Sequence, residues 1–216
     1  MQEIINTCYV TTEASRNIAF YSHLIPIFFS LLLGFLVFLK AKDNILSKIF
    51  FVFSIVFSLW LIGDLITWTS DNYYLVYAVW SLLLYIEVLF FILGLYFVIV
   101  FVRKSDISLL FKTLLFSGSL VPLFITITLK SVTGFNYPVC EAFNNTFLDN
   151  YKLYLEILIL LGILFYFIIP FLKKNIFFDK KSHILVIGSI FLFLATFGIT
   201  EYLASVTAYY ELNLYS

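Results

Sequence analysis

The sequence predicts an all-α, polytopic integral membrane helix bundle, and three observations lead to this prediction. Of the 216 residues, 62% are hydrophobic and 12% are charged, with a mean hydropathy of +1.04; soluble domains are usually about 45–50% apolar and about 25% charged. The apolar residues form runs long enough for a helix to cross a hydrocarbon core of roughly 30 Å. Most basic residues fall in the connections between these runs. We therefore expect one membrane domain over residues 1–216, without a separate soluble domain.

Six apolar segments have the length of a transmembrane helix, the fourth being near the short limit. They cover about residues 18–39, 49–69, 75–102, 113–129, 151–172 and 182–208. The residues before the first segment lack the basic region and the small-residue cleavage site of a secretory signal. They are expected to be a short polar extension outside the membrane.

The positions of lysine and arginine predict the orientation. Ten of the thirteen basic residues lie in three connections: Lys40, Lys42 and Lys48; Arg103, Lys104 and Lys112; and Lys173, Lys174, Lys180 and Lys181. The others, Arg16, Lys130 and Lys152, fall on the opposite side. Because basic loops stay in the cytoplasm, both termini are predicted outside. The predicted location is the cytoplasmic membrane of a bacterium.

Both cysteines fall on the outside in this topology, where disulfides persist. Cys8 precedes the first segment and Cys140 lies in the connection over residues 130–150. We predict a Cys8–Cys140 disulfide between these two regions; the alternative is two unpaired thiols. Their spacing fits neither a zinc site nor a CxxC redox site.

The candidate site is centred on the second segment, where Trp60, Asp64 and Trp68 recur at i, i+4 and i+8. Residues at this spacing lie near one face of a helix. A charged side chain in a membrane helix normally faces the bundle interior or a wet cavity, because exposure to lipid is costly. The stripe therefore predicts a binding site inside the bundle.

Three further acids, Glu87, Glu156 and Glu201, fall within predicted spans, and no lysine or arginine is expected beside them. We predict an acidic cavity that opens outward. Its expected ligand-binding residues are Trp60, Asp64, Trp68, Trp80, Glu87 and Glu201. An acidic, aromatic-lined site favours a small cation, and a proton is the second candidate ligand.

Structural roles are the alternatives for the same acids. Glu156 and Glu201 could be hydrated side chains at the membrane interface. Asp64 and Glu87 could be neutral acids that hydrogen-bond between helices. His23 lies at outer depth in the first segment without an obvious partner, so no metal site is expected.

The sequence does not predict an enzyme. It contains neither the HExxH and P-loop motifs nor the GxGD and GxSG motifs of intramembrane proteases. Because no lysine is expected within a span, a retinal Schiff base is also excluded. No cofactor and no nucleic-acid partner are predicted; the expected partners are the lipid bilayer and a small extracellular or membrane ligand.

Three stretches resemble the N-terminal seven-helix sensor region of bacterial histidine kinases: SKIFFVFSIVFSLWLIGDLITWTS, VWSLLLYIEVLFFILGLYFVIVF and KKSHILVIGSIFLFLATFGITEYLASVTAYYELNLYS. The second helix of that family carries an LW pair, here Leu59-Trp60, and its third helix ends in a Phe-rich stretch, here near residues 95–97. The resemblance covers most of the chain. It implies a receptor-like sensory module that binds a small ligand and signals by helix repacking.

The family continues into a seventh helix and a cytoplasmic kinase or other output domain, whereas this chain ends at Ser216. We expect a fragment of a longer gene, a partner that supplies the seventh helix, or a stand-alone variant, and kinase activity does not carry over. Two other functions compete with a sensor. One is a small proton- or cation-coupled transporter or channel, and the other is a structural membrane subunit without a ligand.

Overall fold

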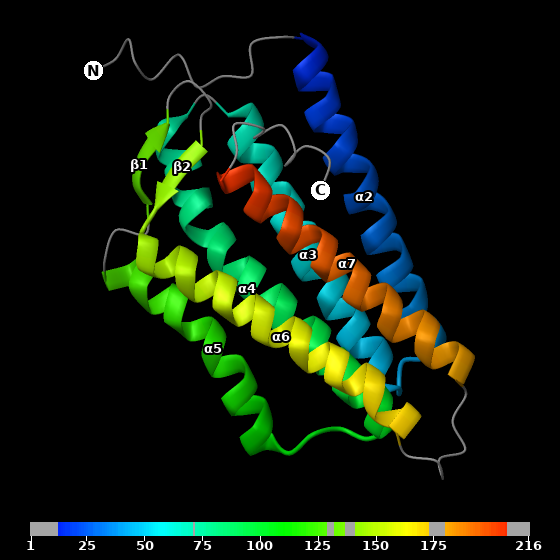
Figure 1. The fold of residues 1–216 in the computed structure, drawn as a ribbon. Helices are drawn as coiled ribbons and strands as arrows, with labels where there is room; N and C mark the ends of the chain where they lie inside the picture. The colour runs from blue at the N-terminus through cyan, green and yellow to red at the C-terminus, as the bar shows by residue number, and fades with distance from the viewer. Residues whose placement is uncertain (1–12, 71, 129–131, 137–140, 173–179, 207–216) are drawn as a thin grey trace.

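The computed structural model describes residues 13–70, 72–128, 132–136, 141–172 and 180–206 (Figure 1). These residues form six helices and one two-stranded sheet. In chain order the elements are α2 (Glu13–Lys40), α3 (Ile45–Thr69), α4 (Tyr73–Arg103), α5 (Leu109–Thr128), β1 (Val132–Asn136), β2 (Glu141–Asn144), α6 (Thr146–Leu172) and α7 (Lys180–Val206).

Five helices are long and apolar enough to cross a membrane, which confirms a multi-pass membrane helix bundle in contact with lipid. Their spanning stretches are Phe20–Lys40, Ile45–Thr69, Tyr74–Arg103, Thr146–Ile169 and Lys180–Leu203. In α5 the described apolar stretch, Leu109–Ile125, is shorter. The sequence had identified that segment as the shortest of the six.

Each helix begins a few residues before its predicted apolar segment. Asn44 precedes α3, and its side chain accepts a hydrogen bond from the amide of Leu46. Asn72 does the same for the amides of Tyr74 and Leu75 at the start of α4. Such caps satisfy amide groups that have no partner within the helix. Hydropathy alone does not detect them.

The β-ribbon is a departure from the predicted all-α chain. Strands β1 and β2 pair antiparallel within the connection between α5 and α6, with a register irregularity between Val132 and Gly134. The predicted disulfide cannot be placed, because Cys8 and Cys140 lie outside the described residues.

Helix α4 is the centre of the bundle and packs against α3, α5, α6 and α7, while α2 packs on α3 (Figure 1). A helix that is apolar all round is suited to burial on all sides. Val88, Phe90 and Phe91 of α4 have no exposed surface. The ring of Phe90 lies 4.5 Å from that of Phe53 and 5.7 Å from that of Phe197, centroid to centroid. This aromatic core joins α3, α4 and α7.

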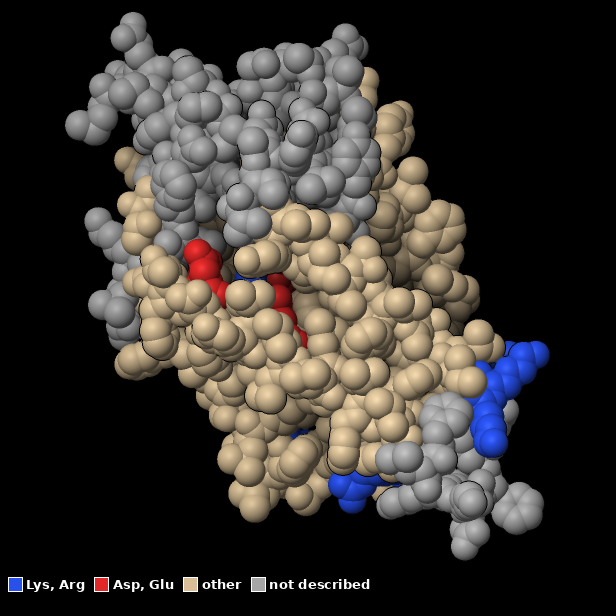
Figure 2. All heavy atoms as spheres, viewed as in Figure 1, with Lys and Arg blue, Asp and Glu red and all other residues tan. Residues whose placement is uncertain are grey.

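Charged side chains separate along the bundle. Lys and Arg side chains project at the end away from the β-ribbon, whereas acidic side chains lie in a hollow nearer the ribbon (Figure 2). At the basic end, Asp106 accepts hydrogen bonds from the Tyr96 hydroxyl and the Lys112 ammonium. These bonds fasten the connection between α4 and α5.

Candidate functional site

The centre of the candidate site is Lys152, whose ammonium is enclosed by acids from two other helices. It lies 3.2 Å from each carboxylate oxygen of Glu87 on α4. It also donates a hydrogen bond to Glu201 Oε1 on α7. The Lys152 side chain is 15% exposed and that of Glu87 is 3% exposed. A buried ion cluster therefore joins α4, α6 and α7.

The expectation that no basic residue accompanies the buried acids is wrong. Lys152 lies on the second turn of α6, which begins at Thr146. A lysine stem can pack along apolar surface while its ammonium reaches a distant partner, so the residue extends from the helix end into the bundle. Because Lys152 lies within a helix that can span the membrane, the absence of such a lysine no longer argues against a retinal Schiff base. The sequence did contain a signal, because Lys152 lies one helical turn before the buried Glu156, although its ammonium pairs with Glu87 and Glu201 instead.

Glu156 lies one turn after Lys152 and contributes a third carboxylate. It is 4% exposed, so the alternative of a hydrated interfacial side chain does not apply to it. Carboxylate oxygens of Glu87, Glu156 and Glu201, one from each residue, all lie within 4.8 Å of one another. Gly198 on α7 lies beside this carboxylate, and a Cβ added there would make an ordinary contact at 3.5 Å with Glu156 Oε2.

A second polar pair joins α2 and α3. His23 Nε2 lies 2.8 Å from Asp64 Oδ2, and the two side chains are 3% and 7% exposed. Ser22 Oγ lies 3.0 Å from His23 Nδ1, so both ring nitrogens have a partner. Thr67 donates a hydrogen bond to the backbone oxygen of Asp64. His23 had no obvious partner in the sequence, and the structure pairs it with Asp64.

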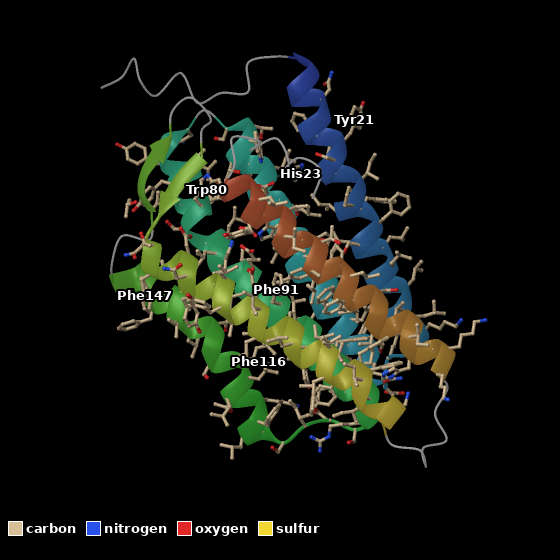
Figure 3. The ribbon with its side chains drawn as sticks, in the orientation of Figure 1. Tyr21, His23, Trp80, Phe91, Phe116 and Phe147 are labelled. Atoms are coloured by element: carbon tan, nitrogen blue, oxygen red, sulfur yellow. The ribbon has the colours of Figure 1, made fainter. Side chains whose placement is uncertain are left out.

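Asp64 of this pair and three residues of the ionic cluster, Glu87, Lys152 and Glu201, line one small cavity. It is lined by Trp60, Asp64, Trp80, Leu83, Leu84, Glu87, Lys152 and Glu201. Its volume of about 30 Å³ holds about two water molecules. His23 and Trp80 both lie in the half of the bundle that carries the β-ribbon (Figure 3).

Five of the six predicted ligand-binding residues line this cavity, and Trp68 is the exception. At 3.6 residues per turn, eight residues rotate by about 80° beyond two full turns. Trp68 is therefore turned away from Trp60, and it is half-buried elsewhere on α3. Trp60 packs edge-on against Phe197 of α7 at 4.6 Å between ring centroids.

The cluster holds more carboxylates than ammonium groups. Three glutamates surround one lysine, so the fully ionised cluster carries a net charge of −2. Isolated net charge is expensive in a low-dielectric interior. The site is therefore suited to binding protons or small cations, and its volume excludes an organic ligand in this conformation.

Comparisons of the chain with protein-family models, curated proteins and solved structures find no match. The function is therefore argued from the geometry of this site.

Proposed function

We propose that the chain is a membrane-embedded sensory module whose stimulus is the gain or loss of protons by the buried ionic cluster. The observation that carries the proposal is the enclosure of Lys152 by Glu87 and Glu201 across three helices. Protonating either glutamate removes one ion pair and leaves the lysine with a single partner. Because the three groups lie on α6, α4 and α7, that change acts directly on the packing of these helices.

The expected coupling is of ordinary size for a conformational switch. Stimulus and conformation are typically coupled by about 1–3 kcal/mol, and breaking one ion pair of a buried cluster is enough to supply it. The resemblance to the sensor region of histidine kinases supports a sensory role over a catalytic one. In this proposal the output domain comes from the same gene or from a partner.

The proposed topology has six membrane spans, with both termini outside a bacterial cytoplasmic membrane. The concentration of basic side chains at one end of the bundle supports it (Figure 2), because basic loops stay in the cytoplasm. The β-ribbon and the ionic cluster would then face the outer half of the membrane. A stimulus from outside would reach the cluster by the shorter path.

The test is thermal melting of the detergent-purified protein between pH 4 and pH 9. We expect a pH-dependent melting temperature in the wild type and a weaker dependence in Glu87→Gln, which keeps the shape of the side chain and removes its charge. Asp43→Asn is the matched control, because Asp43 is exposed at the other end of the bundle. Equal pH dependence in wild type and Glu87→Gln would refute the proposal.

A proton-coupled transporter is the second candidate, supported by a different observation. Titratable side chains from five helices surround or adjoin one cavity, and such chains of groups mark proton relays. They are His23, Asp64, Glu87, Lys152, Glu156 and Glu201. Reconstitution in liposomes with an internal pH dye separates the two functions. A transporter moves protons and loses this flux in Asp64→Asn, whereas a sensor shows no flux above empty liposomes.

A further inference from the structure

We propose that Glu87, Glu156 and Glu201 form a binding site for a divalent metal cation of the size of calcium, beside the Lys152 ammonium. The proposal rests on the proposed function, since it uses the same cluster, and it names a second ligand there. The ligand set draws on α4, α6 and α7, so binding would act on the same helices.

The first support is a set of buried oxygens without hydrogen-bond partners. Among the described residues, Glu87 Oε1, Glu156 Oε1 and Glu201 Oε2 are buried and accept no hydrogen bond. Each glutamate contributes one of these atoms. Glu87 Oε1 lies 3.2 Å from the Lys152 ammonium without hydrogen-bond geometry. Buried acceptors without a partner carry the full cost of losing water, and a cation removes that cost.

The second support is Glu156 itself. Its residue surface is 4% exposed, and no ion pair to it occurs in the described part of the chain, although Lys152 lies one turn away on the same helix. The ammonium is directed to Glu87 and Glu201 instead. A buried carboxylate that is left out of the neighbouring ion pairs is stabilised either by a proton or by a further cation.

Coordination chemistry favours calcium over magnesium at this site, because Ca²⁺ accepts flexible ligand geometry whereas Mg²⁺ demands a near-ideal octahedron. Oxygens on opposite sides of Ca²⁺ are about 4.6–5.2 Å apart, and those around Mg²⁺ about 4.0–4.2 Å, from the usual metal–oxygen distances. The three ligand atoms lie within 4.8 Å of one another, a separation that a single Ca²⁺ can bridge. About two waters in the adjoining cavity, together with a bidentate carboxylate, bring the count to the six to eight oxygens that Ca²⁺ takes.

The charge of the cluster predicts that protons and the divalent cation compete for the same carboxylates. Three carboxylates and one ammonium are neutralised by one divalent cation or by two protons. Asp64 lines the same cavity from α3, and His23 of α2 is paired with Asp64. Binding of the cation should therefore release protons, up to about two per cation, because the ligands must be deprotonated.

The test is calorimetric titration of the full chain, purified in detergent and freed of metal with a chelator, with CaCl₂ and with MgCl₂. Titration at one pH in two buffers of different ionisation enthalpy measures the protons released. We expect Ca²⁺ to bind more tightly than Mg²⁺, with proton release, and binding to weaken at least tenfold in Glu156→Gln. Asp43→Asn is the control and should bind as the wild type does. A circular-dichroism melt checks that each variant is folded.

Absence of Ca²⁺ binding in the wild type, unchanged binding in Glu156→Gln, or tighter binding of Mg²⁺ would each overturn the inference. Failure here is distinguishable from failure of the proposed function. A pH-dependent melt that is lost in Glu87→Gln, without any Ca²⁺ binding, removes the metal site and leaves the proton sensor. Ca²⁺ binding to a protein whose melting temperature shows no such pH dependence removes the proton sensor and leaves the metal site.

Discussion

Replacing Lys152 by methionine tests the ionic cluster most directly. Methionine keeps most of the apolar stem and removes the ammonium that lies 3.2 Å from the Glu87 carboxylate. Two carboxylates then lose their shared partner, and the Glu87 side chain is 3% exposed, so bulk solvent compensates little for the lost ion pair. Removing one partner of a buried ion pair costs about 3–5 kcal/mol. For a chain of this length, that free energy corresponds to a melting temperature lower by about 6–20 °C.

The assay is thermal unfolding of detergent-purified variants, followed by intrinsic tryptophan fluorescence. Lys48→Met is the matched control, because Lys48 is also on a helix and is exposed at the basic end. It should melt within about 2 °C of the wild type, as surface substitutions usually change stability by no more than about 0.5 kcal/mol. Adding Glu87→Gln to Lys152→Met should recover part of the loss, because it removes an uncompensated charge.

Two outcomes would refute this reasoning. If Lys152→Met melts like Lys48→Met, the ammonium is not part of a buried ion cluster. If Lys152→Met is destabilised and the added Glu87→Gln lowers stability further by its own full cost, the two residues act independently. Lowering the pH provides another check. Protonation of the carboxylates should reduce the difference in melting temperature between Lys152→Met and the wild type.

Two further predictions concern packing and the basic end. Gly63→Ala places a Cβ 2.6 Å from a methyl of buried Leu83, and this overpacking should lower the free energy of unfolding by about 1–3 kcal/mol. In the control Gly188→Ala, the added Cβ meets its nearest neighbour at 4.0 Å, so its melting temperature in a thermal melt should be unchanged or slightly higher. Equal effects of the two substitutions would contradict the close contact of α3 and α4. The hydrogen bond from Lys112 holds the pKa of Asp106 below its ordinary value, so this bond stabilises the α4–α5 connection above the ordinary aspartate pKa and is lost as the pH falls through the lowered value. Asp106→Asn should therefore reduce amide protection over residues 104–112 at neutral pH in hydrogen-exchange mass spectrometry, with the difference from wild type vanishing in acid; a difference that persists in acid would point to another cause.

The sequence predicted much of the site because intramembrane charge is rare. Asp64 and Glu87 could be picked out from composition and depth, and the tryptophans from helical spacing. Trp68 was assigned to the site because i, i+8 spacing resembles a single helical face. Each step of four residues, however, rotates the side chain by about 40° around the helix axis relative to the residue before it. Periodicity therefore predicts nearest neighbours along a face better than distant ones.

The missed residues share another cause. Lys152 was assigned to the outer end of its segment from its position in the chain, and His23 was left without a partner. Their partners, Glu87 and Asp64, are 65 and 41 residues away. Which of several buried acids a side chain meets depends on the rotation and crossing of helices, and neither can be derived from one segment at a time.

By itself, the sequence determined that this chain is a multi-pass membrane protein and approximately where its helices lie. Those are local properties: a lipid-exposed backbone must satisfy its own hydrogen bonds, so a span needs one continuous apolar helix. Only the tertiary structure decided that a lysine enters the acidic cluster and that the cavity holds little more than water. Both facts follow from the packing of α4 against α3, α6 and α7, where the position of each charged atom is set by helices far apart in the chain.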